Sequence, residues 1–466
     1  MFDMSVKTLA QAIRHRDISV TNVVTTHLNR IREVNPKLNA VVRLSEQSAY
    51  DQAAAADDAL DRGHIPGPLF GVPMTIKDSF DTAGVISTGG TEGRANHIPA
   101  RDASVVRRLR EAGAILLGKT NTSELTMTYK TDNLIYGQTN NPFDLSRSPG
   151  GSSGGAAAIV AAGGSAFDIG SDYGGSLRFP AHCCGITTIK PTSGRVPRTG
   201  HILPFGGVLD SFQQVGPLTR FVEDLALILP IISGPDYIDP SIIPMTLNDP
   251  YRVTLAGLKA AFHTDNGIMA PSPETEKAVR DAVAALDEQG LIVSEQCPDV
   301  ITQTYDLMIG LLSADGGASI RRLLKDAGTR RHTLPWLGLS DPIDATRFDA
   351  LMMDWCRFRS TMLSFIKDWD VLICPVNALP AMPHGDGHDL EAFSYTMTYN
   401  LTGWPVVVVR AGTSPEGLPI GVQIVAQPFR EDIALAVAGY LEQALVGFQP
   451  PSEKPFQSSS QMATPS

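Results

Sequence analysis

The sequence lacks several features that define specialised classes of protein. Its five cysteines include no Cys-x-x-Cys pair, so neither a zinc knuckle nor a disulfide framework is indicated. Lys and Arg number 38 against 49 Asp and Glu, and the formal charge of −11 leaves no basic surplus for binding a phosphate backbone. We therefore expect no nucleic acid partner.

Long apolar runs are missing as well. The first 13 residues carry polar and charged side chains at short intervals, unlike the apolar core of a signal peptide. The longest aliphatic stretch, residues 225–232, is interrupted by Pro230 and is too short to cross a bilayer. These observations predict a cytoplasmic protein with no membrane contact.

The 466 residues, 43% of them hydrophobic, suffice for a large buried core. Helical and strand-like patterns alternate along the chain, which predicts an α/β fold with a large mixed central sheet covered by helices on both faces. No stretch resembles a flexible linker between domains. We expect one domain at 1–449, comprising a helical collar at 1–65, a catalytic core at 66–215 and a helical substrate-side insertion at about 250–368, followed by a flexible tail at 450–466.

One literal motif match suggests a nucleotide-binding protein. Residues 113–120, GAILLGKT, fit the P-loop pattern G-x-x-x-x-G-K-T. A P-loop follows a strand and precedes a helix, whereas here a helical pattern precedes Gly113 and AILL itself is typical of a strand. The context disfavours a P-loop-like nucleotide binder.

A second match suggests a hydrolase of another type. Residues 151–155, GSSGG, fit the nucleophile elbow G-x-S-x-G with Ser153 as nucleophile. This interpretation needs a histidine further along the chain, and several qualify by order alone: His201, His263, His332, His384 and His388. His384 and His388 beside Asp386 also suggest a metal site, but no third ligand is evident, and we expect no metal there.

A third constellation needs no histidine: Lys77, Ser152 and Ser176. A hydroxyl nucleophile needs a base, and a neutral amine acting through a second hydroxyl supplies one. Ser176 follows two glycines whose N–H groups are unobstructed and free to face a developing oxyanion. Ser152 precedes the small-residue run 156–162, which predicts a helix beginning just after it.

Lys77 is suited to be the base because it lies in GVPMTIK, a segment with few charges. A free lysine has a pKa near 10.4, which must fall by roughly 3 units for the amine to act as a base at neutral pH. Only a dry site achieves this. The neighbouring Asp78 need not contact the amine, because successive strand residues point to opposite faces.

These segments resemble the amidase signature family of Ser-cisSer-Lys hydrolases. The similarity covers most of the chain, from GVPMTIKDSFDTAG through GKTNTSE, the Gly- and Ser-rich block and PAHCCGITTIKPTSGRV to NLTGWPVVVV and GLPIGVQIVAQPF. Lys77, Ser152 and Ser176 stand at the family's spacing in three separate matching segments.

The resemblance implies a role for each residue. It makes Ser176 the acyl-forming nucleophile, Ser152 the bridging serine and Lys77 the base, with a cis peptide between Gly151 and Ser152. Backbone N–H groups would form the oxyanion hole, and other residues would support the site or contact substrate. The hole would comprise Tyr173, Gly174, Gly175 and Ser176, the supporting residues would be Ser153, Asp172 and Arg178, and the substrate contacts would be Thr126 and Met127.

Some positions depart from the family's commonest pattern. Ser171 and Tyr173 flank Asp172 where threonines are frequent. Phe179 stands where the A subunits of tRNA-dependent amidotransferases usually carry Gln, which weakens the alternative that the chain belongs to such a complex.

The expected activity is hydrolysis of small-molecule amides through an acyl-enzyme intermediate, with no cofactor. The expected substrates are linear amides. Carbamate, urethane and ester side activities stay open, as does a homodimer.

Overall fold

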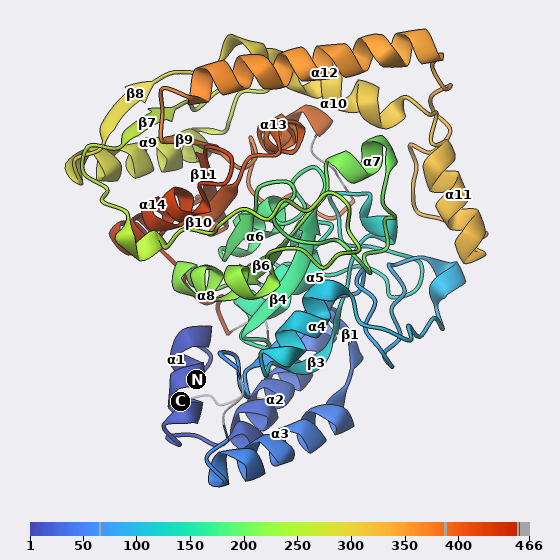
Figure 1. Cartoon of the computed structure of the whole chain (residues 1–466), viewed down its shortest axis with the longest axis vertical. Helices are drawn as coiled ribbons and strands as arrows, with labels where there is room; N and C mark the ends of the chain where they lie inside the picture. Colours follow the sequence, from blue (N-terminus) through green and yellow to red (C-terminus); the bar gives the residue numbers. More distant parts are fainter. Residues whose placement is uncertain (65–66, 386–388, 454–455, 457–466) are drawn as a thin grey trace, which may run out of the picture.

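The computed structural model describes residues 1–64, 67–385, 389–453 and 456. Eleven strands form one mixed sheet in the order β1-β3-β2-β4-β6-β5-β10-β11-β9-β7-β8. Parallel pairing joins β2 to β3 and β4, and joins β7 to β8 and β9, while the other pairs are antiparallel. The predicted mixed sheet with helices on both faces is confirmed (Figure 1).

The strands are short and mostly buried, and their bounds agree well with the apolar runs of the sequence. They are β1 (Val41–Leu44), β2 (Pro73–Lys77), β3 (Ile115–Thr120), β4 (Phe167–Asp172), β5 (Thr187–Lys190), β6 (Gln214–Thr219), β7 (Lys259–Phe262), β8 (Ile292–Glu295), β9 (Val371–Pro375), β10 (Val406–Thr413) and β11 (Pro419–Ala426).

Fourteen α-helices lie in the described part of the chain. They are α1 (Val6–Arg14), α2 (Val20–Leu38), α3 (Glu46–Asp61), α4 (Ser104–Glu111), α5 (Gly154–Ala161), α6 (Arg178–Cys184), α7 (Gly207–Ser211), α8 (Val222–Ile232), α9 (Pro273–Glu288), α10 (Thr304–Ser313), α11 (Ala318–Ala327), α12 (Ala345–Ile366), α13 (Ser394–Thr402) and α14 (Glu431–Ala444). None of the helices in this part is long and apolar enough to span a bilayer.

Strand alternation divides the hydrophobic core between the two faces of the sheet. On β10, Val407 and Val409 pack into one cluster, which also includes side chains of α4, α8, α9 and α14. Val406 and Val408 pack into the other, together with side chains of α6, α10, α12 and α13. Such two-sided burial explains why these strands have continuous apolar sequences.

The predicted insertion at about 250–368 is not wholly helical. Its first part supplies β7 and β8, which extend the sheet at one edge, and α9, which covers the sheet. From residue 299 to 368 the described elements are helices only, and α10 and α12 lie along one end of the molecule in Figure 1. The four-residue β8 is half exposed, so it lacks the apolar signature of a central strand.

The first residues of the predicted flexible tail are anchored. Glu453 forms an ion pair of 2.7 Å with the buried Arg30 on α2, and the guanidinium of Arg30 lies 5.7 Å from the centre of the Phe456 ring. Phe456 is only 5% exposed. Within the predicted flexible tail, Glu453 and Phe456 thus contact the folded core, while residues 454–455 and 457–466 lie outside the described part.

We predict that Phe456→Ala lowers the free energy of unfolding by about 3 kcal/mol, because it leaves a cavity beside α2. Urea unfolding followed by circular dichroism measures this change. Tyr237→Ala is the matched control, because this aromatic side chain is 97% exposed and its loss is expected to cost at most about 0.5 kcal/mol. Equal effects for both variants would contradict the anchoring of the C-terminal segment.

Candidate active site

Lys77 ends β2 in the interior of the sheet, and its side chain is fully buried. Its Nζ lies 2.7 Å from Ser152 Oγ, 2.9 Å from Ser153 Oγ and 3.0 Å from Ser171 Oγ. The structure thus brings together the lysine and two serines that the sequence singled out, and adds a third serine at the end of β4.

Ser152 and Ser153 immediately precede α5, as the small-residue run predicts, and the peptide bond between Gly151 and Ser152 is cis. Packing around this segment leaves no room for larger side chains. A Cβ on Gly151 would lie 2.7 Å from the backbone of Lys130, and one on Gly155 would lie 2.5 Å from the backbone nitrogen of Asn121. The glycines therefore allow the start of α5 to approach the backbone of Lys130 and of Asn121, the residue that follows β3.

Burial lowers the pKa of Lys77 to about 7, although Asp172 and Asp168 favour the charged form and oppose the shift. A large fraction of the amine is thus neutral at neutral pH. Asp78, the next residue, does not contact the amine, because its carboxylate accepts a hydrogen bond of 3.0 Å from the Thr88 N–H on the opposite side.

Ser176 lies in the loop between β4 and α6, and it is 4% exposed. Asp172 shapes this loop, accepting hydrogen bonds from the N–H groups of Gly175 (2.9 Å) and Leu177 (3.1 Å). The Gly175 N–H is therefore occupied, which corrects the expectation that it is free to face an oxyanion. Among the described residues, no acceptor engages the N–H groups of Tyr173, Gly174 or Ser176.

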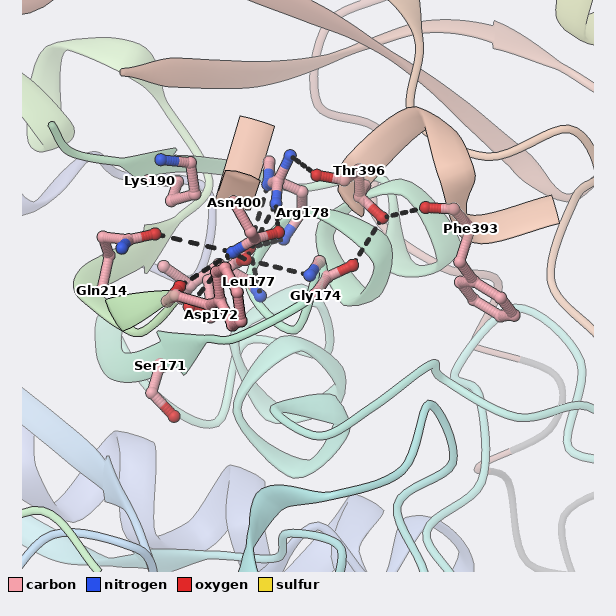
Figure 2. A network of polar contacts seen from close by, with 12 residues as sticks. Ser171, Asp172, Gly174, Leu177, Arg178, Lys190, Gln214, Phe393, Thr396 and Asn400 are labelled. Atoms are coloured by element: carbon pink, nitrogen blue, oxygen red, sulfur yellow. Dashed lines mark hydrogen bonds and ion pairs between the residues drawn. The ribbon is translucent and has the colours of Figure 1, made fainter. Parts of the chain in front are cut away.

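Asp172 is held by a buried network of polar contacts (Figure 2). Arg178 pairs with it through two bonds, Nη2 to Oδ1 at 2.8 Å and Nε to Oδ2 at 3.0 Å, and both side chains are fully buried. Asn400 on α13 donates to Asp172 Oδ1 at 2.8 Å. Burial raises the pKa of Asp172, but Arg178, Lys190 and Asn400 outweigh it and hold the pKa well below its usual range.

Asp172 and Arg178, which the family resemblance marks as supporting residues, thus pair with each other and brace the loop. Figure 2 shows the side chain of Ser171 directed away from this network. Adjacent strand residues point to opposite faces. On β4, the Asp172 carboxylate therefore faces the loop, while the Ser171 hydroxyl faces Lys77.

Two further hydroxyl groups hold the loop, and sequence reasoning missed both. Tyr129 and Thr396 donate to the carbonyl of Gly174 at 2.9 Å and 2.7 Å. Thr396 and Asn400 lie four residues apart on α13, so they share one face of this helix. That spacing of polar residues in an otherwise buried helix was the signal available in the sequence.

The structure contradicts the P-loop interpretation. Lys119 lies within β3 and is buried, with its Nζ donating to Thr82 Oγ1 at 2.8 Å and to Ser87 Oγ at 3.1 Å. Its ammonium group thus holds the segment after β2 together. The first element after Thr120 is a single 3-10 turn at Glu124–Thr126, so no α-helix follows the motif.

In the described part of the chain, no histidine is hydrogen-bonded to Ser153 as a nucleophile elbow would require. Ser153 accepts from Lys77 and lies 3.3 Å from the carbonyl of Ser171, to which its hydroxyl donates. His201 is nearby, but its Nε2 contacts Ser171 and not Ser153. No cluster of three metal-ligating side chains occurs in the described residues, and His388 lies outside them.

Thr126 and Met127 lie in and just after the 3-10 turn that follows β3. Thr126 is 3% exposed, while Met127 is partly buried and packs against hydrophobic clusters on both sides. Their contact with substrate stays a prediction.

Comparison with known proteins identifies the family of this chain. The sequence model of the amidase family matches residues 22–435. An acylamidase from Rhodococcus erythropolis is 34% identical over 94% of this chain and 95% of its own length. The A-type component of the glutamyl-tRNA(Gln) amidotransferase of Alkaliphilus metalliredigens is 32% identical over 95% of this chain and 96% of its own.

A solved structure of 6-aminohexanoate cyclic dimer hydrolase, in complex with its substrate, superimposes with a TM-score of 0.85 at 28% identity, covering 96% of this chain and 98% of that chain. The chain belongs to the amidase signature family. It is an amide hydrolase of that family and acts on C–N bonds.

The buried ion pair leads to a prediction for stability. Asp172→Asn leaves Arg178 without a counter-charge, so the free energy of unfolding should fall by about 3 kcal/mol at pH 7. Because the folded pKa of Asp172 is depressed, this contribution is complete above the ordinary value near 3.9 and is lost as the pH falls towards the folded value.

Urea unfolding between pH 5 and 8 should therefore give a constant difference between the variant and the unaltered protein. Asp144→Asn is the control, since its pair with Arg147 is partly exposed and worth less than about 1 kcal/mol. A difference below about 1 kcal/mol for Asp172→Asn would contradict the bracing role.

Proposed function

We propose that this enzyme hydrolyses amides by a Ser-Ser-Lys mechanism with Ser176 as nucleophile, Ser152 as bridge and Lys77 as base. The observation that carries the proposal is the 2.7 Å contact between the buried Lys77 Nζ and Ser152 Oγ. A charged lysine could not act as a base, and burial supplies the neutral amine.

The proton moves in two coupled steps. Ser152 gives its hydroxyl proton to the lone pair of Lys77 and takes the proton of Ser176, whose oxygen attacks the carbonyl carbon of the substrate. The negative charge that develops on the carbonyl oxygen is stabilised by the free N–H groups of Tyr173, Gly174 and Ser176. Gly175 does not contribute, because its N–H serves Asp172.

The same groups complete the reaction. Protonated Lys77 returns the proton through Ser152 to the departing amine, which leaves Ser176 acylated. Water then attacks the acyl group, its proton follows the same route, and the acid is released. Ser153 supports Lys77 by accepting one of its hydrogen bonds.

Linear amides are the proposed substrates, with carbamates and esters as side activities. The 34% identical acylamidase supports this choice. The A subunits of amidotransferases are similarly close, so a role as the ammonia-releasing member of a complex is the second candidate. The two candidates share the chemistry of the site and differ in the amide that is cleaved.

Ser176→Ala should abolish hydrolysis and labelling by a fluorophosphonate probe, because no other hydroxyl replaces the attacking oxygen. Hydrolysis is measured on matched p-nitroanilide amides and p-nitrophenyl esters and carbamates of varied acyl length, with release of ammonia from glutamine as the test of the amidotransferase candidate. Ser153→Ala is the matched control and should still be labelled. An active Ser176→Ala together with an inactive Ser153→Ala would establish the nucleophile elbow instead.

The base role of Lys77 predicts a pH dependence. Because the amine is neutral above its pKa, kcat/KM of the unaltered enzyme should rise through pH 7 and level off above it. Lys77→Ala should lose about 10³-fold at pH 7 and less at pH 9.5, where hydroxide partly replaces the amine. Initial rates of hydrolysis over this pH range measure the effect, and melting temperatures verify that the variant folds. An equal loss of kcat/KM at pH 7 and pH 9.5 would argue against the base role.

A further inference from the structure

His201 lies close to the proposed base, although the mechanism above does not use it. Its backbone forms an isolated bridge to Phe80, three residues after Lys77, and its ring packs edge-on against the Phe80 ring with centroids 5.0 Å apart. The N–H of Ile202 donates to the carbonyl of Ser79 at 2.8 Å. The imidazole is 8% exposed and is thus fixed relative to the end of β2.

The hydrogen bonds of the ring define its tautomer. The backbone N–H of Leu203 donates to Nδ1 at 3.2 Å, so Nδ1 is the acceptor and the proton of the neutral ring is on Nε2. Nε2 lies 3.1 Å from Ser171 Oγ and therefore donates to it. Ser171 Oγ is in turn 3.0 Å from Lys77 Nζ, which places this hydroxyl between the two nitrogens.

A count of protons shows which form of Lys77 this arrangement favours. A neutral amine has two N–H bonds and one lone pair. The charged ammonium donates to the hydroxyls of Ser152, Ser153 and Ser171. In the neutral amine two N–H bonds remain, and we infer that they stay on Ser152 and Ser153 while the lone pair accepts the proton of Ser171, whose oxygen already accepts from His201. When Lys77 is protonated, the lone pair is lost, and no other acceptor for the Ser171 proton lies within hydrogen-bond distance among the described residues.

His201 strengthens this preference. A hydroxyl oxygen that already accepts an N–H bond becomes a better donor and a poorer acceptor of a second N–H bond, since neighbouring hydrogen bonds polarise one another. The N–H of His201 therefore favours Ser171 as donor to the neutral amine. Rotation about the Cε–Nζ bond of Lys77 then turns the lone pair towards Ser152 for the reaction.

The charged groups around this pair are few. Asp172 and Asp168 favour protonated Lys77, while burial disfavours it. Burial, Lys77 and Arg198 all lower the pKa of His201 far below its ordinary value. The ring is therefore neutral throughout the range in which Lys77 titrates.

We propose that His201, acting through the hydroxyl of Ser171, is a positioning residue that keeps the Lys77 amine neutral and ready to accept a proton. This inference rests on the proposed role of Lys77 as base. It assigns a function to a histidine that the Ser-Ser-Lys mechanism does not require.

The experiment measures the rate of Ser176 labelling by a fluorophosphonate between pH 5.5 and 9.5, which requires no knowledge of the substrate. His201→Phe keeps a ring against Phe80 and removes the N–H donor. The midpoint of the acid limb should move upward by about 1 pH unit, the size expected for one hydrogen bond. A more apolar neighbour alone would move it downward through stronger desolvation of Lys77.

The double variant tests the route through Ser171. In a Ser171→Ala background, His201→Phe should cause no further shift, because the hydroxyl that transmits the effect is absent. A shift that persists there, a downward shift, or an unchanged midpoint in His201→Phe overturns the proposal. If His201→Phe does not fold, as judged by its melting temperature, His201→Leu carries the same expectation.

Failure of this inference can be distinguished from failure of the proposed function. If Ser176→Ala is still labelled, or Lys77→Ala keeps the original acid limb, the Ser-Ser-Lys mechanism itself is wrong. If both behave as expected and only the histidine variant shows no shift, the mechanism stands and His201 has no part in it.

Discussion

The burial of one lysine amine among hydroxyl groups is the constraint on which the rest of the site depends. Lys77 Nζ has three serine oxygens within 3.0 Å and no carboxylate in contact among the described residues. A carboxylate at that distance would hold the ammonium in its charged form, whereas hydroxyl groups serve both as acceptors for the charged form and as donors to the neutral one. The amine can therefore gain and lose a proton while its heavy-atom neighbours stay in place, and only N–H and O–H bonds reorient.

This arrangement requires the nearby charges to be kept away from the amine. Asp172 is charged and directly follows Ser171 on β4, yet strand alternation turns its carboxylate to the other side, where Arg178 and Asn400 bind it. The same carboxylate fixes the Gly175 and Leu177 N–H groups and so defines the loop that carries Ser176. One strand thus supports Lys77 on one face and the loop that carries Ser176 on the other.

Much of this was predictable from the sequence. The alternation of helical and strand-like patterns predicted the mixed central sheet, and the glycines around Ser152 make close contacts with the backbone of Lys130 and Asn121. The residues that sequence reasoning missed lie far from the catalytic segments in the sequence but contact them in the fold. The spacing of Thr396 and Asn400 marks a polar face of α13, but the contact of Thr396 with the Gly174 carbonyl depends on how two distant segments pack. The half-exposed strand β8 lacks the hydrophobic pattern from which a strand is predicted. Phe456 is an isolated aromatic residue, and its contact with Arg30 of α2 likewise depends on tertiary packing.

Phe179 shows how a departure from the amidotransferase pattern fits the packing of this site. Its ring contacts the ring of Phe393 edge-on, with the ring centroids 4.9 Å apart. Phe393 in turn stacks on Tyr129, with a centroid distance of 3.6 Å. Tyr129 in turn donates to the Gly174 carbonyl. A glutamine at position 179 would place an amide against two aromatic rings and remove an apolar support of the tyrosine that holds the loop. The aromatic side chains and the loop therefore form one packed unit, so the loop that carries Ser176 is held in place by the core of this chain itself.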